Sequence, residues 1–130
     1  MMTKQEHIDY WVKTAENDWA AVQNIYKATE YIYALFLAHL VLEKLLKAHW
    51  VKDNAENTPP KIHHLVYLAN KTKLSFTEEE TNFFNLINQF QLEGRYPDYK
   101  FELIKKYKAI ETKKILEQVN IIRICLLKNL

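Results

Sequence analysis

Apolar side chains recur every three or four positions along most of the chain, which is the spacing of one face of an α-helix. The first such stretch predicts a helix over 5–28, and Thr3 and Glu6 have the spacing of a capping box at its start. The second stretch predicts a helix over 30–51 that is apolar nearly all round. That pattern is typical of a central helix or of one at a subunit interface.

The second half of the chain predicts a connection, a short helix and two longer helices. The segment 53–61 contains a Pro-Pro pair and is the clearest linker, and a short helix is expected over 63–72. Thr77 and Glu80 repeat the capping-box spacing and open a fourth helix, for which Gly94 is the expected C-cap.

A turn over 95–98 then leads to one last helix, expected over 101–128. Taken together, the pattern predicts an all-α fold: an antiparallel up-and-down bundle of four long helices plus one short helix. We expect a single domain over 1–130, a length that can bury its own core.

Composition supports helices. One Gly and three Pro are too few for the many turns of a sandwich or barrel. Apolar residues make up 48% of the chain, which argues against disorder. The net charge of +2 is too small to indicate nucleic-acid binding by itself. The segment 100–114, with six Lys against two Glu, is either a solvated helix face or a weak phosphate-contacting surface.

Cys125 is the only cysteine, so no intrachain disulfide can form, and its apolar neighbours predict a core position. The first residues contain no apolar signal segment. The longest apolar run, 31–42, is short of the ~20 residues needed to cross a bilayer. We therefore expect a cytoplasmic protein without a membrane anchor.

Three polar residues interrupt the apolar second helix at a spacing of four: His39, Glu43 and Lys47. They share one edge of that helix, where a charge is costly to bury unless it is paired. They form either an internal ion pair beside a hydrogen-bonded histidine, or a polar stripe that faces a pocket or a dimer partner. A metal site needs a further ligand, so we expect no metal here.

Two other places carry candidate chemistry. His63 and His64 stand at the start of the short helix, where either could bond the backbone or belong to a site. The turn around Arg95 combines a planar donor group suited to phosphate or carboxylate with Tyr96 and Tyr99, which could stack on a base. Alternatively, Arg95 and Asp98 only fasten the turn and bond helix ends.

The sequence shows no complete catalytic set. It has no Gly-rich phosphate loop, no Cys or His metal cluster and no serine elbow. Nothing in it indicates a cofactor.

Three motifs, in order, resemble those of the HEPN domain family. Residues 35–48, LFLAHLVLEKLLKA, resemble the signature F-x-x-H/Q-x-x-x-E-K-x-x-K-A. Residues 61–68 resemble K-x-H-x-L-x-x-L, and residues 95–98 are similar to R-Y-P-D. The first predicted helix, with Trp11, Ala15, Asp18 and Ala21, resembles the family's opening helix, so the likeness covers about the whole chain.

The resemblance implies a helical bundle that commonly forms a homodimer and has a nucleotide or RNA connection. Many HEPN proteins are metal-independent RNases that use an Arg followed, after four to six residues, by a His. Others act with a small nucleotidyltransferase, as in toxin–antitoxin pairs. Here Lys100, Phe101 and Glu102 occupy the positions where that His would follow Arg95.

This departure favours a nucleotide- or nucleic-acid-binding module that is not catalytic by itself. Two alternatives stay open: an RNase with a degenerate motif, and a purely structural dimeric interaction protein. The nucleotide- or phosphate-binding candidates are Arg95, Tyr96, Asp98, Tyr99, His39, Glu43, Lys47, His63 and His64.

Overall fold

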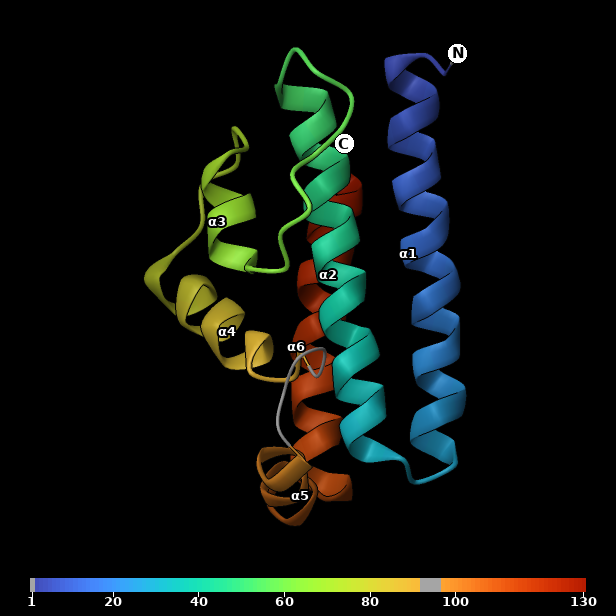
Figure 1. Ribbon diagram of the computed structural model, residues 1–130, viewed down its shortest axis with the longest axis vertical. Helices are drawn as coiled ribbons and strands as arrows, with labels where there is room; N and C mark the ends of the chain where they lie inside the picture. The colour runs from blue at the N-terminus through green and yellow to red at the C-terminus, as the bar shows by residue number, and fades with distance from the viewer. Residues whose placement is uncertain (1, 92–96) are drawn as a thin grey trace.

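The computed structural model describes residues 2–91 and 97–130, with side chains from residue 99 onward in the second range. Six helices follow one another in these ranges (Figure 1). They are α1 (Lys4–Lys27), α2 (Tyr31–Asp53), α3 (Leu65–Asn70), α4 (Glu78–Asn88), α5 (Pro97–Lys106) and α6 (Ala109–Lys128). The all-α prediction is confirmed, and no helix of the described chain is long and apolar enough to span a membrane.

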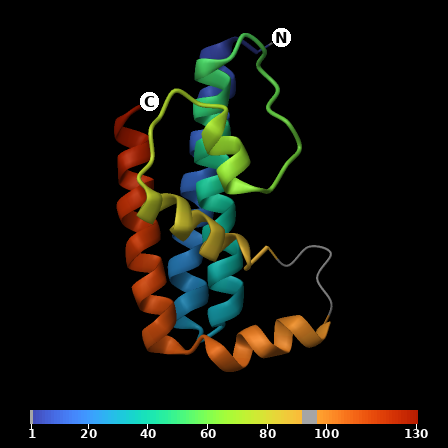
Figure 2. The same cartoon turned by 90° about the vertical axis from the view of Figure 1, so that its left-hand side faces the viewer.

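The long helices α1, α2 and α6 run side by side, and α2 packs against both of the others (Figures 1 and 2). The chain descends through α1, returns through α2 and later ascends again through α6. The ends of α2 and α6 meet, because His49 Nε2 donates to the Leu126 carbonyl over 2.7 Å and Lys52 Nζ donates to the Asn129 carbonyl over 2.9 Å. These bonds fix the register of α2 against α6.

The prediction that α2 is central is confirmed. Fourteen of its residues are buried, and they lie on every side of the helix. Most belong to one apolar core that also includes Phe84, Phe90 and Ile122. A smaller cluster, around Ile8 and Val51, joins the start of α1 to the end of α2. Burying each large apolar side chain stabilises the fold by roughly 1.5–3 kcal/mol, and α2 supplies more buried apolar side chains than any other helix.

Both predicted capping boxes are confirmed. The Thr3 hydroxyl accepts from the Glu6 N–H over 3.1 Å, and the Glu6 carboxylate accepts from the Thr3 N–H over 3.1 Å. Thr77 and Glu80 repeat the arrangement at 3.1 and 2.9 Å. Each box satisfies backbone N–H groups that have no partner inside the helix, so the starts of α1 and α4 follow from sequence alone.

The predicted C-cap at Gly94 is wrong, because α4 ends at Asn88 with Gln89 as its C-cap. The next N–H groups, of Phe90 and Gln91, bond carbonyls three residues back over 3.1 Å, which tightens the chain into a turn. This early end lets the Phe90 ring pack edge-on against Tyr107, with centroids 4.8 Å apart. Gly94 itself lies outside the described residues.

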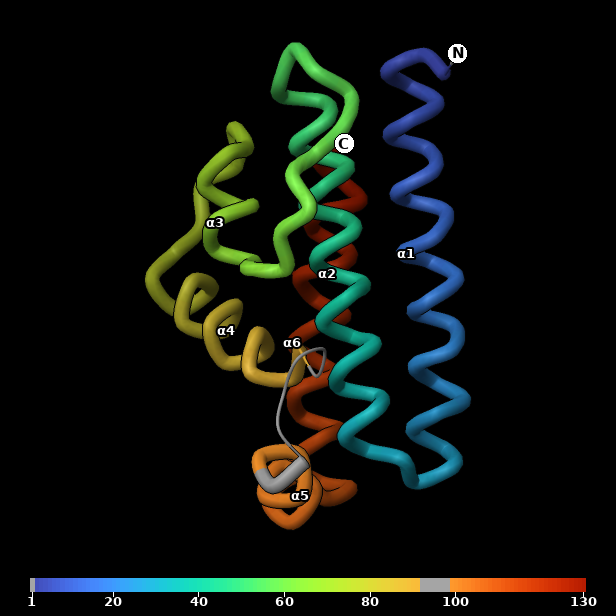
Figure 3. The backbone as a smooth tube through the Cα atoms, in the orientation of Figure 1, coloured from blue at the N-terminus to red at the C-terminus, as the bar shows by residue number. Residues whose placement is uncertain are grey.

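The single last helix expected over 101–128 is also wrong: the chain forms α5 and α6, with a break at 107–108 that Figure 3 lets the reader follow. The N–H of Lys108 donates to the Glu111 carboxylate over 3.1 Å, and the Tyr26 hydroxyl donates to the Ala109 carbonyl over 3.1 Å. A side chain from α1 thus helps to fix the new helix start. Neither Gly nor Pro marks the break, and the helical spacing of apolar residues continues through it. The sequence therefore predicted one helix where the chain forms two.

Cys125 is exposed, not a core residue as its neighbours suggested. Ile122 and Leu126 occupy the buried face of α6, and Cys125 lies one position off it. The apolar run 121–127 covers both the buried and the exposed side of α6, so apolar neighbours did not place Cys125 in the core.

Candidate functional site

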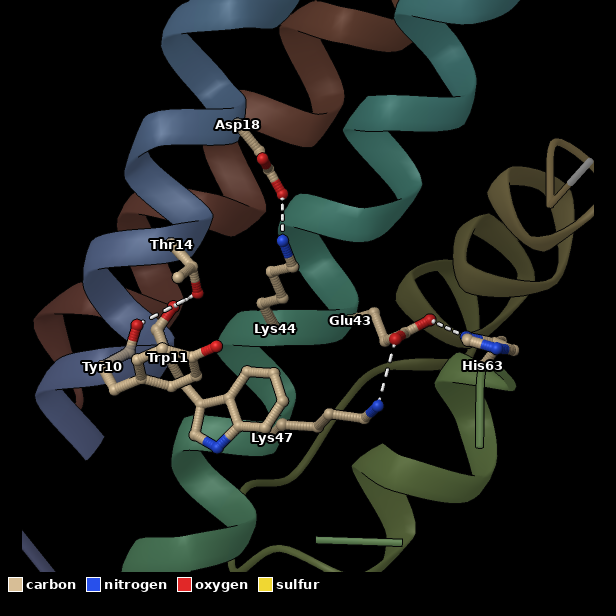
Figure 4. Close-up of polar contacts among 8 residues, drawn as sticks. All are labelled: Tyr10, Trp11, Thr14, Asp18, Glu43, Lys44, Lys47 and His63. Atoms are coloured by element: carbon tan, nitrogen blue, oxygen red, sulfur yellow. Dashed lines mark hydrogen bonds and ion pairs between the residues drawn. The ribbon is translucent and has the colours of Figure 1, made fainter. Parts of the chain in front are cut away.

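Glu43 is the buried centre of a polar cluster, which we call the Glu43 cluster: His39, Glu43, Lys47 and His63. Glu43 is 3% exposed, in the middle of α2. One carboxylate oxygen, Oε2, accepts from Lys47 Nζ over 3.1 Å, and the other, Oε1, lies 2.8 Å from His63 Nδ1 (Figure 4). One helix and the connection 54–64 therefore meet at a single carboxylate.

Lys47 is held between this carboxylate and an aromatic ring. It lies one turn after Glu43 on α2, and its ammonium is 5.4 Å from the centroid of the Trp11 ring on α1 (Figure 4). The residue is 7% exposed. A buried ammonium requires a counter-charge and hydrogen bonds, so Glu43 and Trp11 together account for the presence of a lysine in an apolar helix.

His39 holds the connection from inside the core. It is fully buried, and its Nε2 lies 3.0 Å from the His63 carbonyl oxygen. Because a carbonyl only accepts, Nε2 carries the proton. Burial lowers the pKa of His39 and outweighs the nearby Glu43 carboxylate, which acts in the opposite direction. The ring is therefore neutral, and its Nδ1 has no hydrogen-bond partner among the described residues.

His63 is the solvent-accessible member of the cluster, with 45% of its side chain exposed. The carboxylate beside Nδ1 selects the tautomer with a proton on that nitrogen. The Glu43 carboxylate orients the imidazole of His63, and the His39 ring bonds the His63 carbonyl. Both the side chain and the backbone of His63 are therefore held in place.

His64, the adjacent candidate, has a different place. It is the N-cap of α3, where its Nδ1 accepts from the Tyr67 N–H over 3.2 Å, and it is exposed. Histidine is acting here as a capping acceptor at a helix start. The structure thus separates the pair: His63 joins the cluster, and His64 caps a helix.

The structure describes only part of the turn predicted around Arg95. Arg95 and Tyr96 lie outside the described residues. Asp98 falls in the first turn of α5, and its side chain is not among those described. Tyr99 is half-buried and packs against the core. Their roles as binding candidates remain predictions.

Sequence reasoning missed two contacts between α1 and α2, the first of which reaches the cluster. Trp11 packs on Lys47, and Asp18 forms an ion pair with Lys44 (Figure 4). A signal was available, since Trp11 and Asp18 are one heptad apart and so lie on the same side of α1. No group of three or more His, Cys, Asp or Glu side chains in the described ranges is arranged to hold a metal ion.

Comparison with family models matches the chain to the HEPN domain over residues 8–129. The chain belongs to the HEPN family, as its three motifs indicated. Comparisons with curated proteins and with solved structures gave no match. Family membership supports a nucleic-acid-related role, and HEPN domains often dimerise.

Proposed function

We propose that residues 1–130 form a single HEPN domain that binds a nucleotide or a nucleic acid, acts as a homodimer and is not catalytic by itself. The observation that carries the proposal is the Glu43 carboxylate, which joins residues from two separate family motifs, Lys47 and His63. A nucleotidyltransferase in a toxin–antitoxin-like pair is the protein partner to test first.

The cluster offers an oriented donor at the surface above a buried charge pair. The opposite charges of Glu43 and Lys47 compensate each other in the interior. No uncompensated buried charge is therefore left for a ligand to neutralise. The exposed imidazole of His63 can donate to a phosphate oxygen when protonated, or lie against a base. Arg95 for phosphate, and Tyr96 or Tyr99 for stacking, complete the proposed set from sequence.

Absence of catalysis is proposed from Lys100, Phe101 and Glu102, which stand where the RNase motif has histidine. Cleavage of RNA normally requires a general acid or base near the scissile phosphate. A binding role needs only the oriented donors and a stacking surface.

Calorimetric titration with ATP, GTP and UTP, with and without Mg²⁺, tests the proposal. His63→Asn removes the oriented imidazole from an exposed position and is expected to weaken binding about tenfold, equivalent to ~1.4 kcal/mol. The matched control is His64→Asn, which keeps an N-cap acceptor on α3 and is expected to bind like the wild type. No heat at millimolar nucleotide, or equal losses in both variants, would contradict the proposal.

One observation favours a second candidate, an RNase that takes its histidine from elsewhere in the fold. Glu43 orients His63 through Nδ1 at 2.8 Å, the relation of a carboxylate to a general-base imidazole. Incubation with labelled RNA decides between the candidates. Cleavage that disappears in both His63→Asn and Arg95→Ala supports the nuclease, whereas intact RNA leaves the binding role.

A further inference from the structure

The outer face of α6 carries exposed isoleucines that the fold does not use. Ile121 is 62% exposed and Ile124 is 50% exposed, and the charged residues Glu117 and Lys128 on either side of them are exposed too. The opposite face of α6 is buried through Ile115, Leu116, Val119, Ile122 and Leu126. Figure 2 shows α6 at one edge of the molecule, with this outer side uncovered by the other helices drawn.

These four exposed residues, which we call the α6 stripe, follow the spacing of a helix-pairing seam. Glu117, Ile121, Ile124 and Lys128 are separated by steps of four, three and four, the alternation of a and d positions in a heptad. Such a seam stays on one side of a helix over this length, since it drifts by only about 20° per heptad, and it fits a second helix with the same spacing.

The α6 stripe is complementary to itself when one copy is reversed. In an antiparallel pair with its axis between residues 122 and 123, Ile121 faces Ile124 of the second copy, and Glu117 faces Lys128 of that copy. Both contacts occur twice by symmetry, which gives an apolar centre with an ion pair at each end. A parallel pair would instead set Glu117 against Glu117 and Lys128 against Lys128, which like-charge repulsion disfavours.

We propose that α6 pairs antiparallel with α6 of a second copy of this chain through the α6 stripe. The residues beside the seam, Gln118, Asn120 and Cys125, carry no formal charge, so nothing beside it opposes the approach.

A second antiparallel register, with its axis one heptad away, is less favourable. It matches Ile121 with Ile110, which is 67% exposed, and Lys114 with Glu117. That register puts four charges at the centre of the contact, where desolvation costs most, and moves the isoleucines to its ends. The proposed register has the apolar centre and polar rim that interfaces favour.

The size of the contact sets the expected affinity. Residues 117–128 span about 18 Å of helix at 1.5 Å per residue, so the pair covers less than the roughly 1,200–2,000 Å² of a stable interface. The dimer is therefore expected to dissociate on dilution.

The pairing also bears on the binding site. In Figure 2, α6 and the connection 54–64, which leads into His63, lie on opposite sides of α2. Each subunit then keeps its own Glu43 cluster, away from the seam. The inference deepens the dimer part of the proposed function, and its test needs no nucleotide, so the two can fail separately.

Sedimentation of the full chain from about 10 µM to about 1 mM tests the proposal, since this range brackets weak association. The wild type is expected to pass from monomer to dimer. Lys128→Glu is expected to weaken association at least tenfold, and the charge swap Glu117→Lys with Lys128→Glu is expected to restore it. Lys114→Glu, another lysine-to-glutamate reversal on the same helix, is the matched control and is expected to dimerise like the wild type.

Three outcomes would overturn the pairing. A wild-type chain that stays monomeric at about 1 mM excludes the second copy as occupant and leaves the stripe for a different partner. Failure of the charge swap to restore a lost dimer excludes the Glu117–Lys128 contact. Equal loss in Lys114→Glu and Lys128→Glu contradicts the register. Far-ultraviolet circular dichroism of each variant separates lost association from lost folding.

Discussion

Removing the Glu43 carboxylate provides the sharpest physical test of the buried cluster. Glu43→Gln keeps the size of the side chain and removes its charge, which leaves the Lys47 ammonium without a counter-ion at a position only 7% exposed. Breaking a buried pair in this way typically costs 3–5 kcal/mol. We expect about 3 kcal/mol here, because the Trp11 ring, 5.4 Å from Nζ, retains part of the stabilisation.

The reciprocal change is expected to cost less. Lys47→Met removes the ammonium, but Glu43 keeps its contact with His63 Nδ1 at 2.8 Å, so a loss of about 1–2 kcal/mol is expected. The double variant Glu43→Leu with Lys47→Met replaces both charges by apolar groups and is expected to lie within about 1 kcal/mol of the wild type. Removing both charges is thus expected to cost less than removing the Glu43 charge alone.

Urea denaturation followed by circular dichroism measures these differences. At a slope of roughly 1–3 kcal/mol per molar urea, a loss of about 3 kcal/mol shifts the midpoint by about 1 M or more. If Glu43→Gln lowered the free energy of unfolding by less than about 1 kcal/mol, or if the double variant were less stable than either single variant, the buried pair would be refuted.

Two further predictions concern stability. Burial lowers the pKa of both His39 and His49 below 6.5, so the unfolded state binds more protons at acidic pH. Stability should be complete above about pH 6.5 and should fall below it by up to ~1.4 kcal/mol per pH unit for each histidine. Urea midpoints at a series of pH values check this. A smaller slope is expected in His49→Gln, and a constant midpoint down to about pH 5 would contradict the assignment. Thr77→Ala removes the cap of α4 and should cost about 1 kcal/mol in the same assay, whereas no change would show that the box contributes nothing.

The sequence predicts the elements whose signals are local. The capping boxes at Thr3 and Thr77 place two helix starts, and the all-round apolar pattern of 30–51 identifies the central helix. The order of helices and the fold class follow from these signals. Each depends on residues within one or two turns of one another, which a single sequence displays directly.

The helix ends near 88 and 107 depend on contacts between distant residues. Phe90 packs on Tyr107, 17 positions later, and Tyr26 bonds the Ala109 carbonyl from across the bundle. Neither Gly nor Pro stands at either place. Helical periodicity continues through both, so the sequence alone predicts longer helices than the chain forms.

The candidate site also has a part that the sequence predicts and a part that only the fold determines. The spacing of His39, Glu43 and Lys47 placed them on one edge of α2, as observed. Periodicity could not predict which of the two adjacent histidines joins that edge, because the connection 54–64 has no helical period; the resemblance of residues 61–68 to K-x-H-x-L-x-x-L picks out His63 but gives no contact for it. Only the fold shows that His63 meets Glu43 and that His64 turns to cap α3.

Histidine side-chain nitrogen resonances, followed during titration with nucleotide or short RNA, test most directly whether the Glu43 cluster is a binding site. The chain has five histidines, so each can be resolved in one spectrum, and those outside the cluster serve as internal controls. A saturable shift of the His63 Nε2 resonance is expected, while His49, which bonds α6 outside the cluster, and His64, which caps α3, stay unchanged. A spectrum in which His63 does not respond to any ligand, although binding is detected by heat, would contradict the assignment of this cluster as the site.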